Sequence, residues 1–312
     1  MVKRITVLMA CYNGEKWLPE QLASLQKQDD RHWRALLQDD GSTDNTPDML
    51  AQLCAADPRF ALGAEQGRHF GAIGNFWSLL AQDDGDYTAL CDQDDVWEAD
   101  RLSRCRQALE RAEKQYGADT PILVHSDCRV TDGEGKPLHE SFFDHQGWDR
   151  SATGLKRLLV QNNVTGCTVL MNAALRKLAV AHGDPAKMAM HDWFLALTAA
   201  AFGHVVIVDA PLVNYRQHGT NVKGASHQNL ATRGVKALSA WEKGKKRIDL
   251  TYRHTEAFWK AYGDALPEVA TREIVAYLAT ERLPKMKRVL AVQKLGYTMQ
   301  SVITRAGQVI FG

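Results

Sequence analysis

Neither paired cysteines nor a long hydrophobic run occurs in this sequence of 312 residues. The six cysteines are scattered, without the spacing of a zinc site or a disulfide framework, so we expect reduced and mostly buried thiols. No apolar run reaches the roughly 18 to 20 residues that a membrane-spanning helix needs, and residues 1–9 have the pattern of a strand rather than of a secretion signal. These absences predict a cytoplasmic protein.

The glycine-rich phosphate-binding motifs are also missing. No Gly-x-Gly-x-x-Gly follows the first expected strand, and there is no Walker lysine motif. Both absences argue against a dinucleotide-dependent oxidoreductase and against a P-loop phosphohydrolase. A nucleotide bound by this chain would therefore have to be held by carboxylates and a metal ion.

What is present is the composition of a globular protein, with 45% hydrophobic and 24% charged residues and a net charge of only +1. That small net charge conceals an asymmetry, because residues 223–312 carry 16 Lys and Arg against 7 Asp and Glu, whereas residues 1–222 carry 22 against 30. The acidic part suits metal and hydroxyl-rich ligands, and it would repel nucleic acid. The basic part suits anionic lipid or phosphate, but a solvated helical face would have the same composition.

Short apolar strands alternate with helical patterns, which favours an α/β domain with a mostly parallel sheet flanked by helices. We expect strands over residues 5–10, 35–37, 87–91 and 204–208, and helices over residues 17–25, 49–53, 75–80 and 100–114. Asn13 is a candidate cap for the first helix, and Ser42, Thr43 or Asp44 for the second.

Three carboxylates, Asp92, Asp94 and Asp95, follow directly after the strand expected over residues 87–91. Like charges at such spacing raise each other's pKa, and a bound cation would relieve the repulsion. Oxygen ligands suit Mg²⁺ or Mn²⁺, although a solvated acidic turn is the alternative. Because ligands of open parallel sheets bind beyond the carboxyl ends of the strands, Tyr12, Asp39 and Asp40 should converge with Asp92 and Asp94 on one crevice.

Four ordered motifs make the chain recognisable. They are Val7-Leu-Met-Ala-Cys-Tyr-Asn-Gly-Glu-Lys-Trp-Leu, Asp39-Asp-Gly-Ser-Thr-Asp, Gly71-Ala-Ile-Gly-Asn-Phe and Asp92-Gln-Asp-Asp-Val-Trp. Over about residues 3–222 the sequence resembles the family 2 glycosyltransferases of the GT-A fold, especially their bacterial rhamnosyltransferase-like branch. The resemblance implies a GT-A catalytic domain over residues 1–222, followed by a basic helical C-terminal region over residues 223–312.

The resemblance also assigns residues to the nucleoside-diphosphate sugar that would be the donor. The donor-binding residues would be Ala10, Tyr12, Asp40, Asn75, Asp92 and Arg216. Mn²⁺ or Mg²⁺ would be held by Asp94, as the direct ligand, with Asp92 and His218. Whether Asp92 or Asp95 is the second participant is left open, and an incidental histidine in a surface loop is the alternative for His218.

On the acceptor side, the segment Met190-His-Asp-Trp-Phe-Leu begins a helical pattern. The family places its catalytic base here, usually in a pair of acids, so Asp192 would be the base, although an acid at a helix start is often only a cap. His191 replaces the first acid and would tune that base or touch the acceptor, unless it is structural. Gly166 would allow the loop beneath the acceptor to approach closely. Residues 211–221 look like a closing loop.

The expected activity is a metal-dependent, inverting transfer of a sugar to a saccharide or lipid-linked oligosaccharide in surface polysaccharide biosynthesis, with dTDP-rhamnose as a plausible donor. The alternatives are a sugar-phosphate nucleotidylyltransferase and a noncatalytic sugar-binding module. In the tail, a helical stripe from Met286 to Ile303 beside basic residues would suit peripheral binding to the inner face of the membrane. It would equally suit packing against the catalytic domain or a second subunit.

Overall fold

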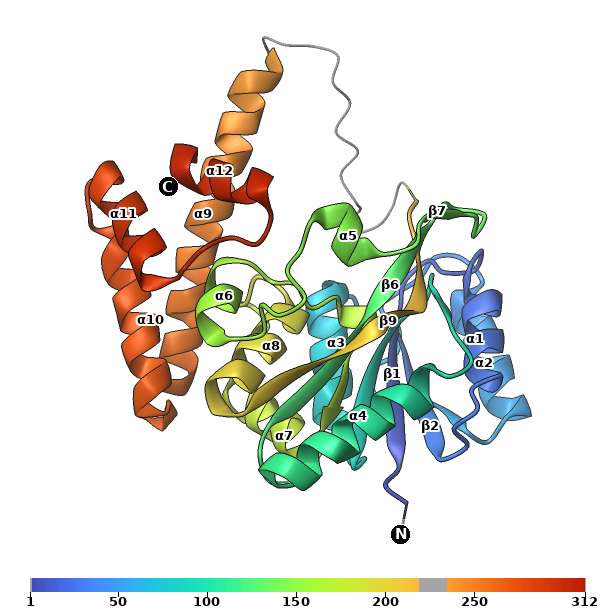
Figure 1. The fold of residues 1–312 in the computed structure, drawn as a ribbon. Coiled ribbons are helices and arrows are strands. Elements are labelled where there is room, and N and C mark those ends of the chain that lie inside the picture. Colours follow the sequence, from blue (N-terminus) through green and yellow to red (C-terminus); the bar gives the residue numbers. More distant parts are fainter. Residues whose placement is uncertain (1, 219–234, 312) are drawn as a thin grey trace.

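A single mixed sheet forms the centre of the protein (Figure 1). The structure is a computed structural model that describes residues 2–218 and 235–311. The first half of the sheet is parallel, in the order β3 (Phe60–Leu62), β2 (Trp33–Asp39), β1 (Ile5–Cys11) and β4 (Tyr87–Asp92). The second half continues with β8 (Leu170–Asn172), β6 (Ile122–Thr131), β9 (His204–Arg216) and β5 (Val96–Trp97), and β7 (Pro137–His139) pairs with β6. The expected parallel sheet is therefore parallel around β1 and mixed beyond β4, where β8 runs antiparallel to both neighbours.

Helices cover both faces of this sheet. They are α1 (Leu18–Gln26), α2 (Thr46–Ala56), α3 (Gly71–Gln82), α4 (Arg101–Tyr116), α5 (Phe142–Gln146), α6 (Leu155–Val160), α7 (Ala173–His182) and α8 (His191–Phe202), with a 3₁₀ turn η1 (Gly166–Thr168). Alternate residues of β1 enter separate cores, because Leu8 belongs to one buried cluster whereas Val7 and Met9 belong to the other. The expected helices and strands are present, mostly with longer bounds.

Asn13 does not cap the first helix, which begins at Leu18. Its backbone takes a left-handed φ of 47°, and its side-chain oxygen accepts a hydrogen bond of 2.8 Å from the main-chain N–H of Thr43. The residue therefore joins the loop after β1 to the loop after β2. Among the caps expected for the second helix, Asp44 accepts a hydrogen bond from the N–H of Thr46, the first residue of α2.

The strand expected over residues 204–208 is longer than its sequence pattern, because β9 continues to Arg216. Its pairing with β6 shifts register around Asp127, which accommodates Pro211 in the ladder even though proline has no N–H to donate. Residues 211–216 of the expected closing loop are thus strand. Residues 219–221 of that loop, and the expected domain boundary at residue 222, lie outside the described residues.

The C-terminal region forms a bundle of α9 (Val235–Tyr262), α10 (Glu268–Glu281), α11 (Lys285–Leu295) and α12 (Val302–Phe311), with a 3₁₀ turn η2 (Gly263–Ala265) (Figure 1). The helical stripe expected from Met286 to Ile303 is broken at Gly296, whose φ of 85° ends α11, so that α12 is a separate helix. The side chains of residues 302 and 303 lie outside the described set.

The bundle and the sheet share one hydrophobic core. Tyr262 stacks on Phe194 of α8, with ring centroids 5.8 Å apart, and Phe258 packs edge-on against the same ring. Ile274 and Tyr277 of α10 are fully buried in the same cluster. The bundle is thus continuous in its packing with the sheet. Among the described residues, no helix has both the length and the apolar character needed to cross a bilayer.

Candidate active site

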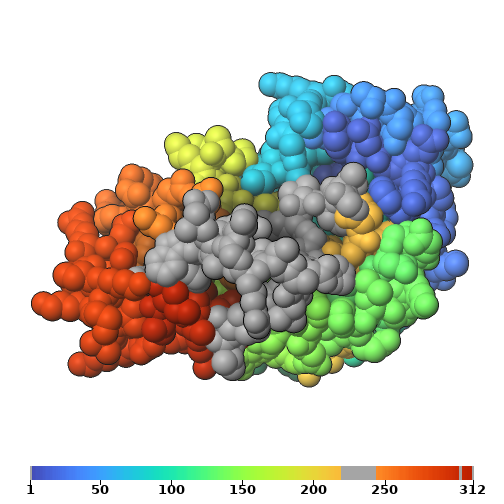
Figure 2. Space-filling view, turned by 90° about the horizontal axis from the view of Figure 1, so that it is seen from above, coloured from blue at the N-terminus to red at the C-terminus, as the bar shows by residue number. Residues whose placement is uncertain are grey.

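A cleft of about 1030 Å³ lies beyond the carboxyl ends of the strands. One side of the cleft is formed by residues at the ends of the parallel strands β1, β2 and β4. The other side is formed by the start of α8 and the middle of α9. Seen from above, the N-terminal elements and the C-terminal bundle lie on opposite sides of the molecule (Figure 2). The cleft is lined by these residues expected to function: Ala10, Tyr12, Asp40, Asn75, Asp92, Asp94, Gly166, His191, Asp192 and His218.

The loop after β1 is fastened to the loop after β4 by Gln93. The side-chain oxygen of Gln93 accepts a hydrogen bond of 2.7 Å from the N–H of Tyr12, and its NH₂ group donates one of 2.6 Å to the carbonyl of Tyr12. A Cβ atom on Gly14 would collide with this amide. The clamp presents the Tyr12 side chain, which is 46% exposed, at the cleft. Sequence reasoning missed Gln93, although it stands inside the acidic motif.

Asp40 and Asn75 are held by main-chain groups where β2 meets α3. The carboxylate of Asp40 accepts hydrogen bonds from the N–H groups of Phe70 (2.6 Å) and Gly71 (2.9 Å) at the start of α3. Asn75 exchanges hydrogen bonds with Gln38, accepting one of 2.8 Å and donating one of 3.2 Å to the carbonyl. Both side chains border the cleft in fixed orientations.

The acidic motif separates into two half-buried carboxylates that line the cleft, Asp92 and Asp94, and one fully buried carboxylate, Asp95. Asp92 and Asp94 line the cleft, and Oδ2 of Asp94 lies 2.7 Å from Nε2 of His218. The His218 ring stacks on Trp17 with centroids 3.9 Å apart, which fixes the imidazole. Burial and the neighbouring charges of Asp94 and Asp192 raise the pKa of Asp92 to about 7. This concentration of negative charge suits a cation.

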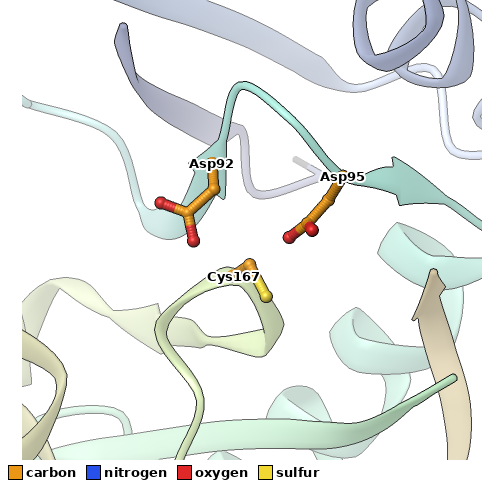
Figure 3. Close-up of side chains that lie close together, drawn as sticks. All are labelled: Asp92, Asp95 and Cys167. Atoms are coloured by element: carbon orange, nitrogen blue, oxygen red, sulfur yellow. The ribbon is translucent and has the colours of Figure 1, made fainter. Parts of the chain in front are cut away.

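Asp95 lies behind the cleft rather than in it. It is fully buried, and its Oδ1 accepts a hydrogen bond of 3.0 Å from the N–H of Arg216. Figure 3 shows its carboxylate near that of Asp92, with the Cys167 side chain close to both, and potential ligand atoms of the three residues lie within 4.8 Å of one another. Burial, and then the charges of Asp95 and Asp92, raise the pKa of the Cys167 thiol well above its usual value, so it stays protonated and ligates poorly.

Two groups of side chains could hold a metal ion. The group that faces the cleft suits a hard divalent ion better than the group formed by Asp92, Asp95 and Cys167. Asp92, Asp94 and His218 offer oxygen and nitrogen ligands where a diphosphate can also reach. These are the three ligands that the sequence predicts, and their ligation stays a prediction.

Arg216 is the exception among the expected donor-binding residues, because it does not line the cleft. Its buried guanidinium donates to the carbonyls of Asp94 and Gly133, each at 2.9 Å, and forms an ion pair with Glu20. The expected contact of Arg216 with a diphosphate oxygen stays a prediction, and these protein groups already engage its guanidinium. The side chain holds the loop that carries Asp94 against α1 and the end of β9.

Asp192 begins α8 with one carboxylate oxygen engaged. Oδ1 accepts hydrogen bonds from the N–H of Trp193 (2.6 Å) and from Nδ2 of Asn162 (3.3 Å). Within residues 2–218 and 235–311, Oδ2 accepts no hydrogen bond. One oxygen thus orients the group while the other is available to a ligand in the cleft.

Gly166 and His191 pack against this acid. A Cβ atom on Gly166 would stand 3.2 Å from Nε2 of His191 and 3.6 Å from Cβ of Asp192, so this loop lies close to both residues, and its position beneath an acceptor stays a prediction. The buried ring of His191 stacks on Phe76 with centroids 4.5 Å apart. This packing supports a structural role for His191, and its contact with an acceptor stays a prediction.

An aromatic group on the cleft wall was not anticipated. Phe142 contacts Trp148 at a centroid distance of 5.1 Å and Tyr215 at 5.7 Å, and all three rings line the cleft. Aromatic faces suit the apolar faces of sugar rings. Phe142 and Trp148 are neighbours in the sequence, but Tyr215 is remote from both, so only the fold brings the three rings together.

Comparisons with known proteins agree with this geometry. Residues 6–179 match the family model described as glycosyl transferase family 2. The chain is 27% identical over 231 residues to "dTDP-rhamnosyl transferase RfbG" of Shigella flexneri, covering 70% of this chain and 74% of that protein. It is 25% identical over 238 residues to "Putative glycosyltransferase EpsH" of Bacillus subtilis, covering 74% and 66%.

Among solved structures, S. aureus TarS in complex with UDP-GlcNAc superposes with a TM-score of 0.57 at 15% identity. The superposition covers 99% of this chain and 89% of that one. At this identity the likeness concerns the fold alone, which is that of a GT-A glycosyltransferase.

Proposed function

Because the chain belongs to glycosyl transferase family 2, we propose that its cleft moves a sugar from a nucleoside-diphosphate sugar to a hydroxyl group of a saccharide, with inversion at the anomeric carbon. The observation that carries this proposal is the pairing, in one cleft, of a carboxylate with an open oxygen, Asp192, and a carboxylate–imidazole pair, Asp94 and His218. The first suits a general base, and the second suits the diphosphate side of the donor.

In the proposed reaction, Oδ2 of Asp192 accepts the proton of the acceptor hydroxyl. The hydroxyl oxygen bonds to the anomeric carbon as the bond from that carbon to the diphosphate oxygen breaks, and the bonding pair leaves with the nucleoside diphosphate. Oδ1, held by Trp193 and Asn162, keeps the carboxylate aimed during this step. A divalent ion, Mn²⁺ or Mg²⁺, held by Asp92, Asp94 and His218 would supply positive charge for the leaving diphosphate.

The nucleoside of the donor would lie on the β1 and β2 side of the cleft. Tyr12 offers an exposed ring, and Ala10 and Asp40 border the same region. A dTDP-rhamnose donor is supported by the relative that is named a dTDP-rhamnosyl transferase. We place the acceptor near Gly166 and the aromatic rings of Phe142 and Trp148, in a saccharide or lipid-linked oligosaccharide of surface polysaccharide biosynthesis.

We also propose that the C-terminal bundle binds an anionic membrane surface through a basic apolar patch, which comprises Met286, Leu290, Val309 and Ile310 with Lys285, Lys287 and Lys294. Met286 is 71% and Leu290 62% exposed. Lys285 donates a hydrogen bond to the carbonyl of Ile310, which brings the end of α12 beside the start of α11.

The positive charge around this patch favours anionic lipid as its ligand. Residues 282–311 contain six Lys and Arg and no Asp or Glu. Exposed apolar side chains surrounded by cations are typical of surfaces that bind at the headgroup level of anionic bilayers. The protein would then work peripherally at the cytoplasmic face, where a lipid-linked acceptor is available.

Calorimetric titration of dTDP, UDP and GDP with Mn²⁺ or Mg²⁺ tests the donor side of the proposal. We expect one nucleotide to bind only with metal, and Asp94→Asn to weaken that binding at least tenfold, because a ligand of the metal loses its charge. Asp192→Asn should keep the binding and lower kcat for the matching nucleotide sugar by about 10²- to 10⁴-fold, the usual contribution of a general base. Asp48→Asn, on the exposed face of α2, is the matched control.

Failure of every nucleotide to bind would contradict a donor site. Full turnover by Asp192→Asn would remove this residue as the base. Release of pyrophosphate without sugar transfer would instead favour a sugar-phosphate nucleotidylyltransferase, and sugar binding without turnover a noncatalytic module.

A further inference from the structure

Arg247 projects into the cleft from the C-terminal bundle. It lies on α9, and Leu250 and Thr251, one turn further along that helix, line the same wall. The neighbouring parts of this wall come from α8, through Trp193, and from the loop that holds Asn162. The helix packs against α6 and, through His254 and Phe258, against α8, on the side of the molecule away from α1 and α2 (Figure 1). Arg247 therefore belongs to the acceptor wall, across from Tyr12 and Asp40.

The charge of Arg247 is unmatched. It is the sole Lys or Arg among the described residues that line the cleft, where Asp40, Asp92, Asp94 and Asp192 are all acidic. Its side chain is exposed, and in the described part of the chain it makes no hydrogen bond or ion pair. Many other arginines are paired, as Arg150 is with Asp144 and Arg129 with Glu98.

Two further cations precede Arg247 on the same helix. Lys245 and Lys246 are both exposed, and no ion pair involves either of them within the described residues. These lysines do not line the cleft, but with Arg247 they make this part of α9 basic, which favours an anionic ligand on this side of an otherwise acidic cleft. A guanidinium binds phosphate groups, as it binds carboxylates, with paired hydrogen bonds.

We infer that Arg247 binds a phosphoryl group attached to the acceptor sugar, so that the acceptor is a sugar phosphate or a lipid diphosphate-linked sugar. This inference rests on the proposed function, because it presumes that the wall near Asp192 receives the acceptor. The diphosphate of the donor is a different group, since the site proposed for it is at Asp94 and His218, on the loops after β4 and β9. Arg247 thus determines which acceptors bind without taking part in proton transfer.

Binding measurements on the full chain, preloaded with dTDP and Mn²⁺ so that the donor site is filled, test this inference. The probes are decyl diphosphoryl N-acetylglucosamine, the decyl glycoside of the same sugar without phosphate, N-acetylglucosamine 1-phosphate, and inorganic pyrophosphate. We expect the native protein to bind the diphosphoryl lipid at least tenfold more tightly than the neutral glycoside, and Arg247→Gln to abolish that preference, because a charge-assisted hydrogen bond is lost.

Arg253→Gln is the matched control, since Arg253 is an exposed arginine on the same helix that does not line the cleft. It should keep the preference, and dTDP should bind both variants as it binds the native protein. Arginine-dependent binding of the soluble sugar phosphate or of pyrophosphate, as tight as that of the lipid, would support a phosphate site that ignores the lipid. Much tighter binding of the lipid would support a lipid-linked acceptor.

Equal binding of the diphosphoryl lipid and the neutral glycoside would overturn the inference, as would an undiminished preference in Arg247→Gln. So would a native protein that binds dTDP but not the diphosphoryl lipid. If the native protein did not bind dTDP at all, the proposed donor site would be contradicted instead. The experiment therefore distinguishes an error in the proposed function from an error in this inference.

Discussion

At the scale of single residues, burial changes the pKa of an ionisable side chain because it removes water from the group. His125 on β6 is fully buried, beside the ring of Phe143. Burial lowers the pKa of its imidazole to about 4, because the charged form would lose its hydration. The folded chain therefore holds this histidine neutral at acidities where an unfolded chain would bind a proton.

This difference predicts a pH dependence of stability. Between about pH 6.5 and pH 4 the unfolded state binds a proton at His125 that the folded state does not, so the free energy of unfolding should fall as the pH falls through this window. A shift of about 2.5 pH units corresponds to at most ~3 kcal/mol. Urea unfolding of His125→Leu across that range should show a shallower slope than the native protein.

The matched control is His32→Leu, at an exposed position. It should leave the slope unchanged, which isolates the effect of burial. Parallel slopes for the native protein and His125→Leu would contradict the prediction.

At the scale of elements, the clamp between the loops after β1 and β4 positions the donor side of the cleft. Gln93 holds both the N–H and the carbonyl of Tyr12. Removing the amide in Gln93→Ala should loosen Tyr12 and weaken metal-dependent nucleotide binding by up to about thirtyfold, because two hydrogen bonds of roughly 1 kcal/mol each are lost. Calorimetry of the nucleotide that the native protein binds would measure this.

Gln52→Ala, on the exposed face of α2, controls for the loss of a surface amide. Equal nucleotide affinity of Gln93→Ala and the native protein would show that the loop is rigid without the clamp. Chemical denaturation of both variants separates a local effect on the loop from a loss of overall stability.

Elements that depend on a local sequence pattern could be predicted, whereas features that depend on contacts between distant segments could not. The ends of β1, β2 and β4 were visible because apolar strands run into polar motifs, and the topology of a parallel sheet then gathers Tyr12, Asp40 and Asp92. The position of the Arg216 side chain could not be predicted, because its ion pair with Glu20 joins segments almost two hundred residues apart. The extension of β9 past Pro211 likewise depends on a register shift in its partner strand.

At the scale of the whole molecule, the charge asymmetry of the sequence separates the acidic cleft from the basic C-terminal bundle. Six cations and no acids in residues 282–311 accompany the exposed Met286 and Leu290. We expect the full chain to float with vesicles that contain anionic phosphatidylglycerol but not with neutral phosphatidylcholine vesicles. Flotation should weaken at high salt, since screening reduces the attraction.

The variant that tests the basic apolar patch is Met286→Ser combined with Leu290→Ser. Both side chains are exposed, so folding should persist while flotation is lost. Val269→Ser combined with Val275→Ser, at exposed positions of α10, is the control and should float as the native protein does. Unchanged flotation of the first variant, or none of the native protein, would refute the membrane role.

The two hydrophobic cores also imply an order in which the chain can mature during synthesis. One core draws its residues from between Ile5 and Val213, so it can close as soon as that segment has emerged from the ribosome. The other, which packs Trp193 and Phe194 under the acceptor wall, also needs Tyr277, Tyr297 and Met299. A nascent chain should therefore form its nucleotide-facing loops before its acceptor wall, and a ribosome that stalls between the two stages would leave the aromatic underside of α8 as a target for chaperones.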